Sequence, residues 1–273
     1  MHTRNDDHAS RFRTLHTQGV LRLANAWDAG SARLIESLGA PAIATTSAGV
    51  AWARGYVDGD ALPIERLLDT AKEIARVIRV PLSVDMEGGY SDDPAVVAAN
   101  VVRAAETGAV GINIEDGGGS PDALCAKLSR IRDALASRGL DVYVNARTDV
   151  YLRGLAPPEA RVAMVLERAA RYREAGADGL FVPGVTEAGA IGDIASSAGL
   201  PLNVMLRPGL PPLEEMEVLG VRRLSAGSDI AEAVFAHVGA LANAFLQDGR
   251  VVPGERMAYG AINALFSEVR PSA

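Results

Sequence analysis

Acidic side chains follow several short apolar segments of this chain, and they are the first candidates for chemistry. Asp85 and Glu87 stand in VDMEGGY, and Glu115 stands in NIEDGGG. Carboxylates crowded together without cations repel one another and raise one another's pKa, and a divalent cation removes that conflict. Oxygen ligands without histidine or cysteine suit Mg²⁺ or Mn²⁺, which need only one or two direct carboxylates. We therefore expect Asp85, Glu87 and Glu115 to hold Mg²⁺, with Mn²⁺ as the alternative.

Acidic residues at such positions have a second interpretation, because Asp and Glu are also common in the first turn of a helix. We favour helix capping for Asp28, Asp149 and Asp229, each of which stands immediately before an expected helix. For the three acids that precede glycines, the sequence favours a metal site.

Two further features suit the carboxylate of a small acid. The segment Thr45 to Ala48 combines hydroxyl groups with small side chains, which let an anion approach the backbone amides; an ordinary polar turn is the alternative. Arg147, in NARTD, offers a guanidinium shaped for a bidentate grip on a substrate carboxylate. The alternative for Arg147 is a structural salt bridge to Asp149 or Glu115.

Other catalytic groups are scarce. The chain has only two lysines, Lys72 and Lys127, and both fall inside helical stretches, which disfavours a lysine Schiff base. The single cysteine, Cys125, lies at helical spacing and is expected to pack rather than to react. The histidines lie in the N-terminal arm or on the last barrel helix, away from any strand end: His2, His8, His16 and His237. What remains is chemistry driven by a metal, an arginine and backbone amides.

The net charge and the composition of the chain exclude several classes of binding partner. The 273 residues carry a net charge of −7, so no basic surface is available for nucleic acid, and an anionic membrane surface would repel the chain. No apolar run approaches the ~20 residues that a membrane span needs, and the polar start has no signal-peptide core. One cysteine cannot form an internal disulfide. We expect a reduced, cytoplasmic protein that binds neither nucleic acid nor membrane.

The elements that position these residues follow from a repeated junction, in which a helical stretch, a glycine and a short apolar segment succeed one another. Six glycines mark it: Gly39, Gly108, Gly139, Gly176, Gly199 and Gly220. Further strands are expected at Val20 to Asn25 and at Pro81 to Asp85, the latter after a helix from Leu62 to Ile78. Eight strands that alternate with helices predict an α/β fold, a (β/α)₈ TIM barrel; a doubly wound open sheet is the alternative.

Nothing in the series resembles a linker, so residues 1–273 are expected to form one barrel domain with a helical C-terminal tail from about residue 240 to 273. Barrel enzymes build their sites at the carboxyl ends of the strands. The acids and Arg147 all fall at such ends, and we expect them to converge.

Several of these segments together resemble the isocitrate lyase/phosphoenolpyruvate mutase superfamily. The similarity covers most of residues 15 to 240: NAWDAGSARLIESLGAPAIATTSAGVA, the loop reaching Asp58, PLSVDMEGGYSDDP, GAVGINIEDG and NARTD. It implies a barrel whose eighth helix is swapped between subunits of a homodimer or homotetramer. It also implies a Mg²⁺ site for small 2-oxo acids or dicarboxylates.

The resemblance assigns roles to individual residues. Asp85 would bind the metal directly, while Asp58, Glu87 and Glu115 would act largely through waters, and Asp58, Glu115 and Arg147 would serve catalysis. Arg147 would neutralise the oxo-acid end. The residues expected to hold the substrate, in addition to Arg147, are Thr45, Thr46, Ser47, Ala48 and Asn203.

Departures from the superfamily pattern narrow the reaction. The lyases carry a Lys-Lys/Arg-Cys-Gly-His loop soon after the acids that correspond to Glu115 and Asp116, and this chain has GGGSPDALCAKLSRI there. It also lacks the lysine- and asparagine-containing loop of the mutases. Pro183, Met205 and Leu206 stand where the lyases have a glutamate, a threonine and a glutamate, so the distal half of the pocket is expected to be more apolar.

Retro-aldol cleavage needs both a base and an acid, whereas decarboxylation of a 3-carboxy-2-oxo acid needs mainly an electron sink. The side chains available at the strand ends suit decarboxylation better than retro-aldol cleavage. We therefore predict a Mg²⁺-dependent carbon–carbon lyase for a small 2-oxo or 2-hydroxy dicarboxylate, with oxaloacetate decarboxylation through a metal-stabilised enolate as the most economical case. Carbon–phosphorus chemistry on phosphonopyruvate and a catalytically silent 2-oxo acid-binding protein are the alternatives.

Overall fold

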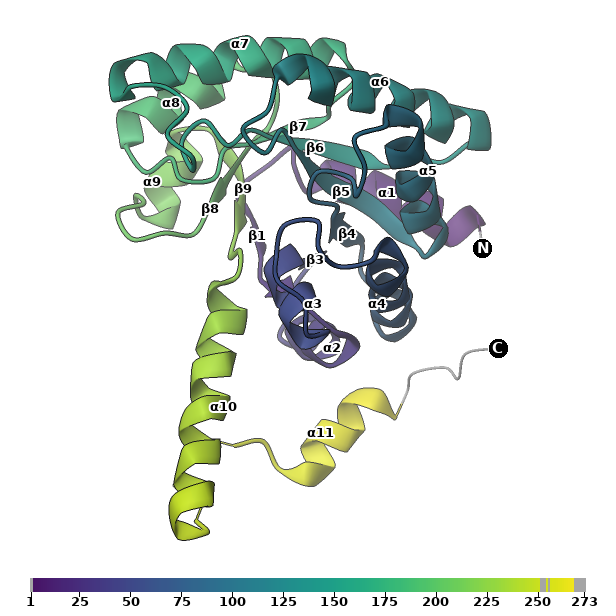
Figure 1. The fold of residues 1–273 in the computed structure, drawn as a ribbon, viewed down its shortest axis with the longest axis vertical. Helices are drawn as coiled ribbons and strands as arrows, with labels where there is room; N and C mark the ends of the chain where they lie inside the picture. The colour runs from purple at the N-terminus through teal and green to yellow at the C-terminus, as the bar shows by residue number, and fades with distance from the viewer. Residues whose placement is uncertain (1, 251–253, 255, 268–273) are drawn as a thin grey trace.

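A ring of parallel strands forms the centre of the molecule (Figure 1). The computed structural model describes residues 2–250, 254 and 256–267, and within them nine strands pair in the order β1-β9-β8-β7-β6-β5-β4-β3-β2. The expected first strand is divided into β1 (Leu21–Leu23), which pairs with β9, and β2 (Asn25–Ala26), which pairs with β3. Since β1 and β2 are consecutive in the chain, they nearly close the ring, and the predicted (β/α)₈ barrel is confirmed.

The remaining strands are short and almost wholly buried, as expected for a sheet covered on both faces. They are β3 (Ile43–Thr45), β4 (Leu82–Asp85), β5 (Ala109–Glu115), β6 (Tyr143–Arg147), β7 (Gly179–Phe181), β8 (Leu202–Met205) and β9 (Val221–Ser225).

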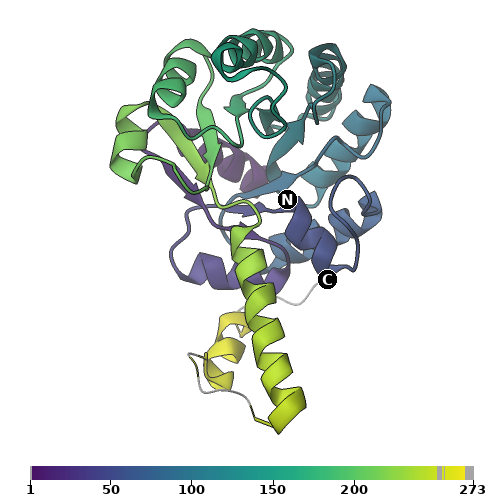
Figure 2. The same ribbon diagram turned by 60° about the vertical axis from the view of Figure 1, so that its left-hand side comes forward.

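Helices surround this ring (Figures 1 and 2). They are α2 (Ala29–Ser37), α3 (Ser47–Ala53), α4 (Ile64–Val77), α5 (Pro94–Glu106), α6 (Pro121–Arg138), η1 (Pro158–Ala160), α7 (Arg161–Glu174), α8 (Ala188–Ser197) and α9 (Leu213–Val218). In α4 the apolar residues fall at three- and four-residue spacing, and Leu67, Ala71 and Ile74 are fully buried.

The glycine junctions behave as the sequence predicts. All six have positive φ, between 63° and 111°. Gly139 shows the reason most clearly: it ends α6 in the left-handed conformation, with its N–H directed to the carbonyl of Ala136. A residue with a Cβ adopts this conformation only with strain, so glycine fixes where each helix stops and the next strand begins.

Helix α1 (His2–Thr14) packs against β5 and β6 near the amino-terminal ends of the strands. Phe12 is fully buried there, and His16 follows it with 3% of its surface exposed. The ring of His16 stacks on Tyr143, with 4.2 Å between centroids, and its Nδ1 lies 2.8 Å from the carbonyl oxygen of Phe12. The N-terminal arm therefore fills the floor of the barrel, at the end opposite the expected active site.

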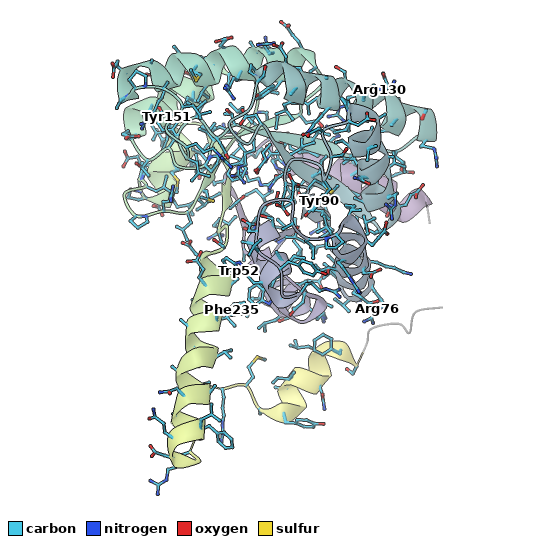
Figure 3. All side chains as sticks on the ribbon, viewed as in Figure 1. Trp52, Arg76, Tyr90, Arg130, Tyr151 and Phe235 are labelled. Atoms are coloured by element: carbon cyan, nitrogen blue, oxygen red, sulfur yellow. The ribbon has the colours of Figure 1, made fainter. Side chains whose placement is uncertain are left out.

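Helix α10 (Asp229–Asp248) leaves the barrel and projects away from it (Figures 1 and 2). Near its start, Phe235 meets the ring of Trp52 edge-on, with 6.0 Å between centroids (Figure 3). Helix α11 (Tyr259–Phe266) turns back towards α2, where Arg33 Nε donates to the Leu265 carbonyl at 2.8 Å. The second half of α10 and the whole of α11 are the described parts of the helical tail that was predicted from about residue 240 to 273. Residues 251–253, 255 and 268–273 of that tail lie outside the described residues.

Helix α10 is long and apolar enough to cross a membrane by length and composition alone, with a mean hydropathy of 1.3 and 6% of its apolar stretch buried. Glu232, His237 and Asn243 interrupt its apolar residues, so it does not contradict the expectation that no uninterrupted apolar run approaches ~20 residues.

Two of the three aspartates that were predicted to cap helices lie at the starts of α2 and α10. Asp28 caps α2 as expected, because its Oδ1 accepts the N–H of Ser31 at 2.6 Å in a reciprocal capping box. Asp229 is the first residue of α10, and the capping position falls on Ser228. The prediction was wrong by one residue at this helix.

The buried His16 predicts how stability depends on pH. Burial, together with the field of Arg223, lowers the pKa of His16 to about 3. An unfolded histidine titrates near 6.5, so between these values the unfolded chain binds the extra proton, and stability falls as pH decreases from about 6.5 towards 3. We expect a loss of roughly 1 kcal/mol for each pH unit in that window.

Urea unfolding at pH 7, 6 and 5 measures this effect. His16→Gln removes the titrating ring and should flatten the pH dependence, whereas the control His237→Gln, on an exposed histidine of α10, should keep it. Equal slopes for the two variants would contradict the assignment.

Candidate active site

Asp85 ends β4 at the carboxyl edge of the barrel, and 9% of its surface is exposed. Its backbone N–H donates to Thr45 Oγ1 at 2.8 Å, which joins it to the end of β3. The carboxylate accepts backbone N–H groups of Ser47 and, at 3.4 Å, of Glu87. The hydroxyl of Thr45 and the amide of Ser47 therefore position the predicted metal ligand.

The helix that supplies Ser47 approaches β2 very closely. A Cβ on Gly49 would lie 2.7 Å from Thr46 Cγ2 and 2.9 Å from Trp27 Cβ, so only glycine fits there. The small residues of this segment, which sequence analysis attributed to anion binding, thus also let α3 begin beside β4. Ala48 and Thr46 are both buried at this point.

Glu87 is held in an uncommon backbone conformation, with φ of 49°. Its Oε2 accepts the N–H of Gly59 at 2.9 Å and the N–H of Asp60, and its Oε1 accepts the hydroxyl of Tyr90 at 2.6 Å. Positive φ costs free energy in a residue with a side chain, and these three hydrogen bonds offset that cost. The loop before α4 and the turn after β4 are thereby tied together through one carboxylate.

Lys127 reaches the same turn from α6. Its Nζ donates to the Gly88 carbonyl at 2.7 Å, and its charge lowers the pKa of Asp60 against a larger upward effect of burial. Asp60 Oδ1 accepts the N–H of Tyr90 at 3.2 Å, and a Cβ on Gly88 would lie 2.6 Å from Asp60 Oδ2. Lys127 thus holds the 87–90 turn against the 59–60 loop.

Arg147 lies at the end of β6, beside the end of β5. Its Nη1 is 2.6 Å from Glu115 Oε2, its Nε is 2.7 Å from Asp149 Oδ1, and its guanidinium lies 5.8 Å from the centre of the Phe181 ring. Asp149 is fully buried and also binds Arg153 Nε at 3.1 Å. The prediction that Asp149 caps a helix is therefore wrong: it is an ion-pair partner that orients Arg147.

Asp116 has a structural role, because it connects α7 to the loops after β5 and β6. Its Oδ2 binds Arg168 Nη1 at 2.5 Å and the Tyr172 hydroxyl at 2.7 Å, and its Oδ1 accepts the Asp149 N–H at 3.0 Å. Helix α7 is thereby attached to the loops after β5 and β6. The negative charge of Asp116 is matched by Arg168 and is not available to a ligand.

The structure brings most of the predicted site residues together. Asp85, Glu87, Glu115 and Arg147 gather at the carboxyl edge, and Asp58, exposed in the loop before α4, is close enough to raise the pKa of both Asp85 and Glu87. Thr45 and Ser47 contact Asp85, as described above. Asn203, in β8, is fully buried and accepts the Ser225 hydroxyl at 3.2 Å.

The site carries an excess of negative charge in a poorly solvated place. Burial raises the pKa of Asp85 and, even against the hydrogen bond from Tyr90, that of Glu87. Burial also raises the pKa of Glu115 to about 8, although the field of Arg147 opposes the shift. The charges of Asp85 and Glu87 raise the pKa of Glu115 further, and that of Asp85 also raises the pKa of Glu87, so a cation at this point would relieve the repulsion.

The donor set fits a divalent cation with oxygen ligands. The charge of Arg147 is already shared between Glu115 and Asp149, and the Asp85 carboxylate accepts only backbone N–H groups among its identified hydrogen bonds. In the described part of the chain, no three His, Cys, Asp or Glu side chains converge closely enough to hold a metal ion by themselves. The metal set of Asp85, Glu87, Glu115 and Asp58 therefore stays a prediction, in which one or two carboxylates would bind the ion directly and the others through water.

Sequence analysis missed two contributors to this site, Asp60 and Tyr90. Asp60 lies two residues after Asp58, and Tyr90 closes the VDMEGGY motif, so both stood next to residues that were identified. Their roles depend on backbone N–H groups of one loop meeting a side chain of another, which residue spacing does not indicate.

The scarce catalytic groups lie where the sequence placed them. Lys72 and Lys127 are in α4 and α6, and Cys125 packs partly buried on α6. His237 is exposed on α10. Arg130 has 59% of its side chain exposed, and its Nη1 lies 4.0 Å from Asp133 Oδ2 on α6 (Figure 3). Lys127, on the same helix, contacts the 87–90 turn through the Gly88 carbonyl.

A barrel with acidic residues and one arginine at the carboxyl ends of β4, β5 and β6 is the architecture of the phosphoenolpyruvate mutase/isocitrate lyase superfamily. The profile of the family described as phosphoenolpyruvate phosphomutase matches residues 12–246. The chain belongs to this family, as its motifs indicated.

Three similar proteins place the chain within the family. An uncharacterized protein of Mycobacterium tuberculosis is 36% identical over 248 residues, which cover 89% of this chain and 91% of that protein. The oxaloacetate decarboxylase of Pseudomonas fluorescens is 29% identical over 230 residues, covering 78% and 75%. A crystal structure from Burkholderia cenocepacia, described as a lyase/mutase, superposes with a TM-score of 0.88 at 34% identity and covers 97% of each chain.

The fit of the carboxylates to a divalent cation predicts the effect of neutralising one of them. Asp85→Asn removes the charge of the expected direct ligand, and we expect at least a tenfold loss of Mn²⁺ affinity, measured by calorimetry or by electron paramagnetic resonance of free Mn²⁺. Asp92→Asn, on an exposed acid after the same turn, is the matched control and should bind as the unchanged protein does. Equal affinity of both variants would show that Asp85 does not hold the ion.

Proposed function

We propose that this protein is a Mg²⁺-dependent carbon–carbon lyase that acts on a small 2-oxo or 2-hydroxy dicarboxylate, with oxaloacetate decarboxylation as its reaction. The observation that carries the proposal is the buried carboxylate of Asp85, which lies among further acids while Arg147 is committed to Glu115 and Asp149. A metal that binds to this arrangement together with an anionic substrate would compensate the charge of the buried acids.

Asp85 would bind the metal directly, and Glu87, Glu115 and Asp58 would hold its waters. When bound, Mg²⁺ supplies an electron sink for the charge that develops as the carbon–carbon bond breaks and carbon dioxide leaves. The residues of the chain then have the task of holding the substrate in line with that sink and of excluding competing reactions.

Arg147 would bind the oxo-acid end of the substrate. Its two ion pairs and its position over Phe181 fix the plane of the guanidinium before a ligand arrives, so little side-chain entropy is lost on binding. The backbone and hydroxyl groups of Thr46, Ser47 and Ala48 would hold a carboxylate from the opposite side. Water would donate the proton that the product carbon takes up after carbon dioxide has left.

The short connection after β5 supports decarboxylation over retro-aldol cleavage. Only five residues separate Glu115, at the end of β5, from the first residue of α6, Pro121. The five residues are DGGGS, so this loop lacks the catalytic cysteine segment of the lyases. Lys127 and Tyr90 are both engaged in hydrogen bonds that hold the 87–90 turn.

The relatives also support the proposal, since one of the similar proteins is an oxaloacetate decarboxylase. A phosphoenolpyruvate phosphomutase of Streptomyces hygroscopicus is 33% identical over 183 residues, which cover 62% of this chain. Carbon–phosphorus chemistry is therefore the reaction to test beside decarboxylation. We place the activity in the cytoplasm, on the grounds of the single cysteine and the acidic composition.

The first test is decarboxylation of oxaloacetate by the purified, Mg²⁺-loaded protein, followed as loss of the substrate and appearance of pyruvate. We expect a rate far above that of free Mg²⁺, complete loss with EDTA, and a fall of at least a hundredfold in kcat/KM for Asp85→Asn and for Arg147→Met. Asp92→Asn should retain the full rate.

A rate no higher than that of free Mg²⁺ would overturn the proposal. Formation of phosphate or phosphoenolpyruvate from phosphonopyruvate would instead assign carbon–phosphorus chemistry. Tight binding of 2-oxo acids without any product from a panel of dicarboxylates would identify a binding protein.

We further propose that α10 is exchanged between subunits of a homodimer or homotetramer. Apolar side chains on α10 are strongly exposed, with 49% of Phe235, 57% of Val238 and 82% of Leu246 accessible. Burying each such side chain stabilises an assembly by roughly 1.5–3 kcal/mol. A second copy of this chain is the partner that the resemblance implies.

Val238→Lys tests the assembly. It places a charge on the exposed apolar side of α10, so we expect the dissociation constant to rise at least tenfold in sedimentation velocity. Asp69→Lys, on the exposed face of α4, is the control for surface charge and should leave the assembly intact. A monomeric unchanged protein at micromolar concentration would contradict the proposal.

A further inference from the structure

An arginine lies inside the barrel, beneath the candidate active site. Arg223, in β9, has 1% of its surface exposed and is the largest of the fully buried side chains. The other buried arginine, Arg168, pairs with Asp116, but the identified hydrogen bonds of Arg223 go only to neutral groups. Burial lowers the pKa of Arg223 to about 10, and the field of Asp85 opposes that shift, so the side chain is cationic at neutral pH.

The guanidinium joins two strands across the barrel interior. Its Nε donates to Ser225 Oγ at 3.2 Å, and its Nη2 donates to Asn113 Oδ1 at 3.2 Å. Asn113 stands in register with Asp85 on the neighbouring strand, two residues before Glu115 on β5. A buried cation with neutral partners is costly, and an apolar residue would pack there at lower cost. The cost suggests a role beyond packing.

That role follows from what a guanidinium can do in a hydrogen bond: it only donates. Because Ser225 Oγ accepts from Arg223, the hydroxyl proton of Ser225 is left to donate elsewhere. It donates to Asn203 Oδ1 at 3.2 Å, so the oxygen of that amide faces Ser225. The other end of the amide, Nδ2, is buried and has no hydrogen-bond partner in the structure.

The same logic orders the other side of the guanidinium. Asn113 Oδ1 accepts from Arg223, and it also accepts from Asn145 Nδ2 at 2.9 Å. Donation therefore runs outwards from Arg223 through Ser225 to Asn203, whereas on the other branch Arg223 and Asn145 both donate to the same oxygen of Asn113. One side chain that cannot accept a hydrogen bond sets the orientation of three amides: Asn113, Asn145 and Asn203.

We propose that Arg223 is a positioning residue which, through Ser225, fixes Asn203 with its N–H directed away from Ser225, as the donor for an anionic oxygen of the substrate. The proposal rests on the proposed function and deepens it, since it makes the site selective for a ligand with a second carboxylate. Nδ2 of Asn203 is otherwise a buried donor without an acceptor, which costs free energy that a carboxylate would recover.

A substrate without a carboxylate at that point would leave the Asn203 donor unpaired. Sites built around a fixed buried donor reject analogues that lack the matching acceptor. Met205 and Leu206, on the same strand end, add no competing polar group. The structure therefore assigns to the strands β8 and β9 the discrimination between a dicarboxylate and a monocarboxylate.

The test compares two ligands that differ only in this group, (S)-malate and (S)-2-hydroxybutyrate, by calorimetry with Mg²⁺ present. Neither is a 3-carboxy-2-oxo acid, so the measurement is independent of oxaloacetate decarboxylation. We expect the unchanged protein to bind malate at least tenfold more tightly. Asn203→Ala should abolish the preference, and Ser225→Ala should reduce it severalfold.

A double variant separates a positioning role from general loss of packing. If Ser225 acts through Asn203, then Ser225→Ala should change the preference no further in the Asn203→Ala background. Arg223→Lys, which can still only donate, should keep more of the preference than Arg223→Gln, which can also accept. Should both Arg223 variants fail to fold, the Ser225 and Asn203 variants decide the question.

Equal binding of malate and 2-hydroxybutyrate by the unchanged protein would overturn the inference. Additive effects of Ser225→Ala and Asn203→Ala would do so as well, because they would show that Ser225 acts independently of the amide. Absence of oxaloacetate decarboxylation with the malate preference intact would reject the proposed reaction and leave the role of Arg223 standing.

Discussion

Negative charge buried at one end of the barrel is the constraint on which the rest of the site depends. Asp85, Glu87 and Glu115 lie close together where burial raises the pKa of each of them, yet they are held in place by backbone N–H groups, a tyrosine and one arginine. Those contacts order the three carboxylates, and only the ion pair of Arg147 with Glu115 brings a positive charge to them. Binding of a metal together with an anionic substrate would therefore stabilise these buried carboxylates electrostatically.

Two cations are treated differently in this arrangement. Arg147 is placed among acids, and its ion pairs with Glu115 and Asp149 set its orientation. Arg223 is placed among neutral groups, where its charge is less compensated and its donors orient a hydrogen-bond network. The interior of the barrel thus combines a group of acids with a group of oriented amides, and a dicarboxylate matches that combination better than a monocarboxylate does.

The fold could be predicted from the sequence because each of its determinants is local. Glycines such as Gly139 and Gly108 end helices by a conformation that other residues adopt only with strain, and a buried strand follows each of them within a few residues. The division of the first strand into β1 and β2 was not predictable, since it depends on pairing with β9 on one side and β3 on the other. Similarly, the exposure of α10 depends on where the barrel leaves room, which periodicity does not describe.

The site was predictable in its charges and less so in its contacts. Residue type and strand position identified Asp85, Glu115 and Arg147, because carboxyl ends of parallel strands converge. Asp149 was misjudged as a cap, since a local rule was applied to a side chain whose partners lie two and four residues away in a buried loop. The role of Arg223 could not be predicted from the sequence. Arg223 is one of two successive arginines in a short strand, and only the arginine that faces into the barrel has the proposed role. The alternation of a strand makes that distinction in principle, but it requires the register of β9, which the three-dimensional pairing fixes.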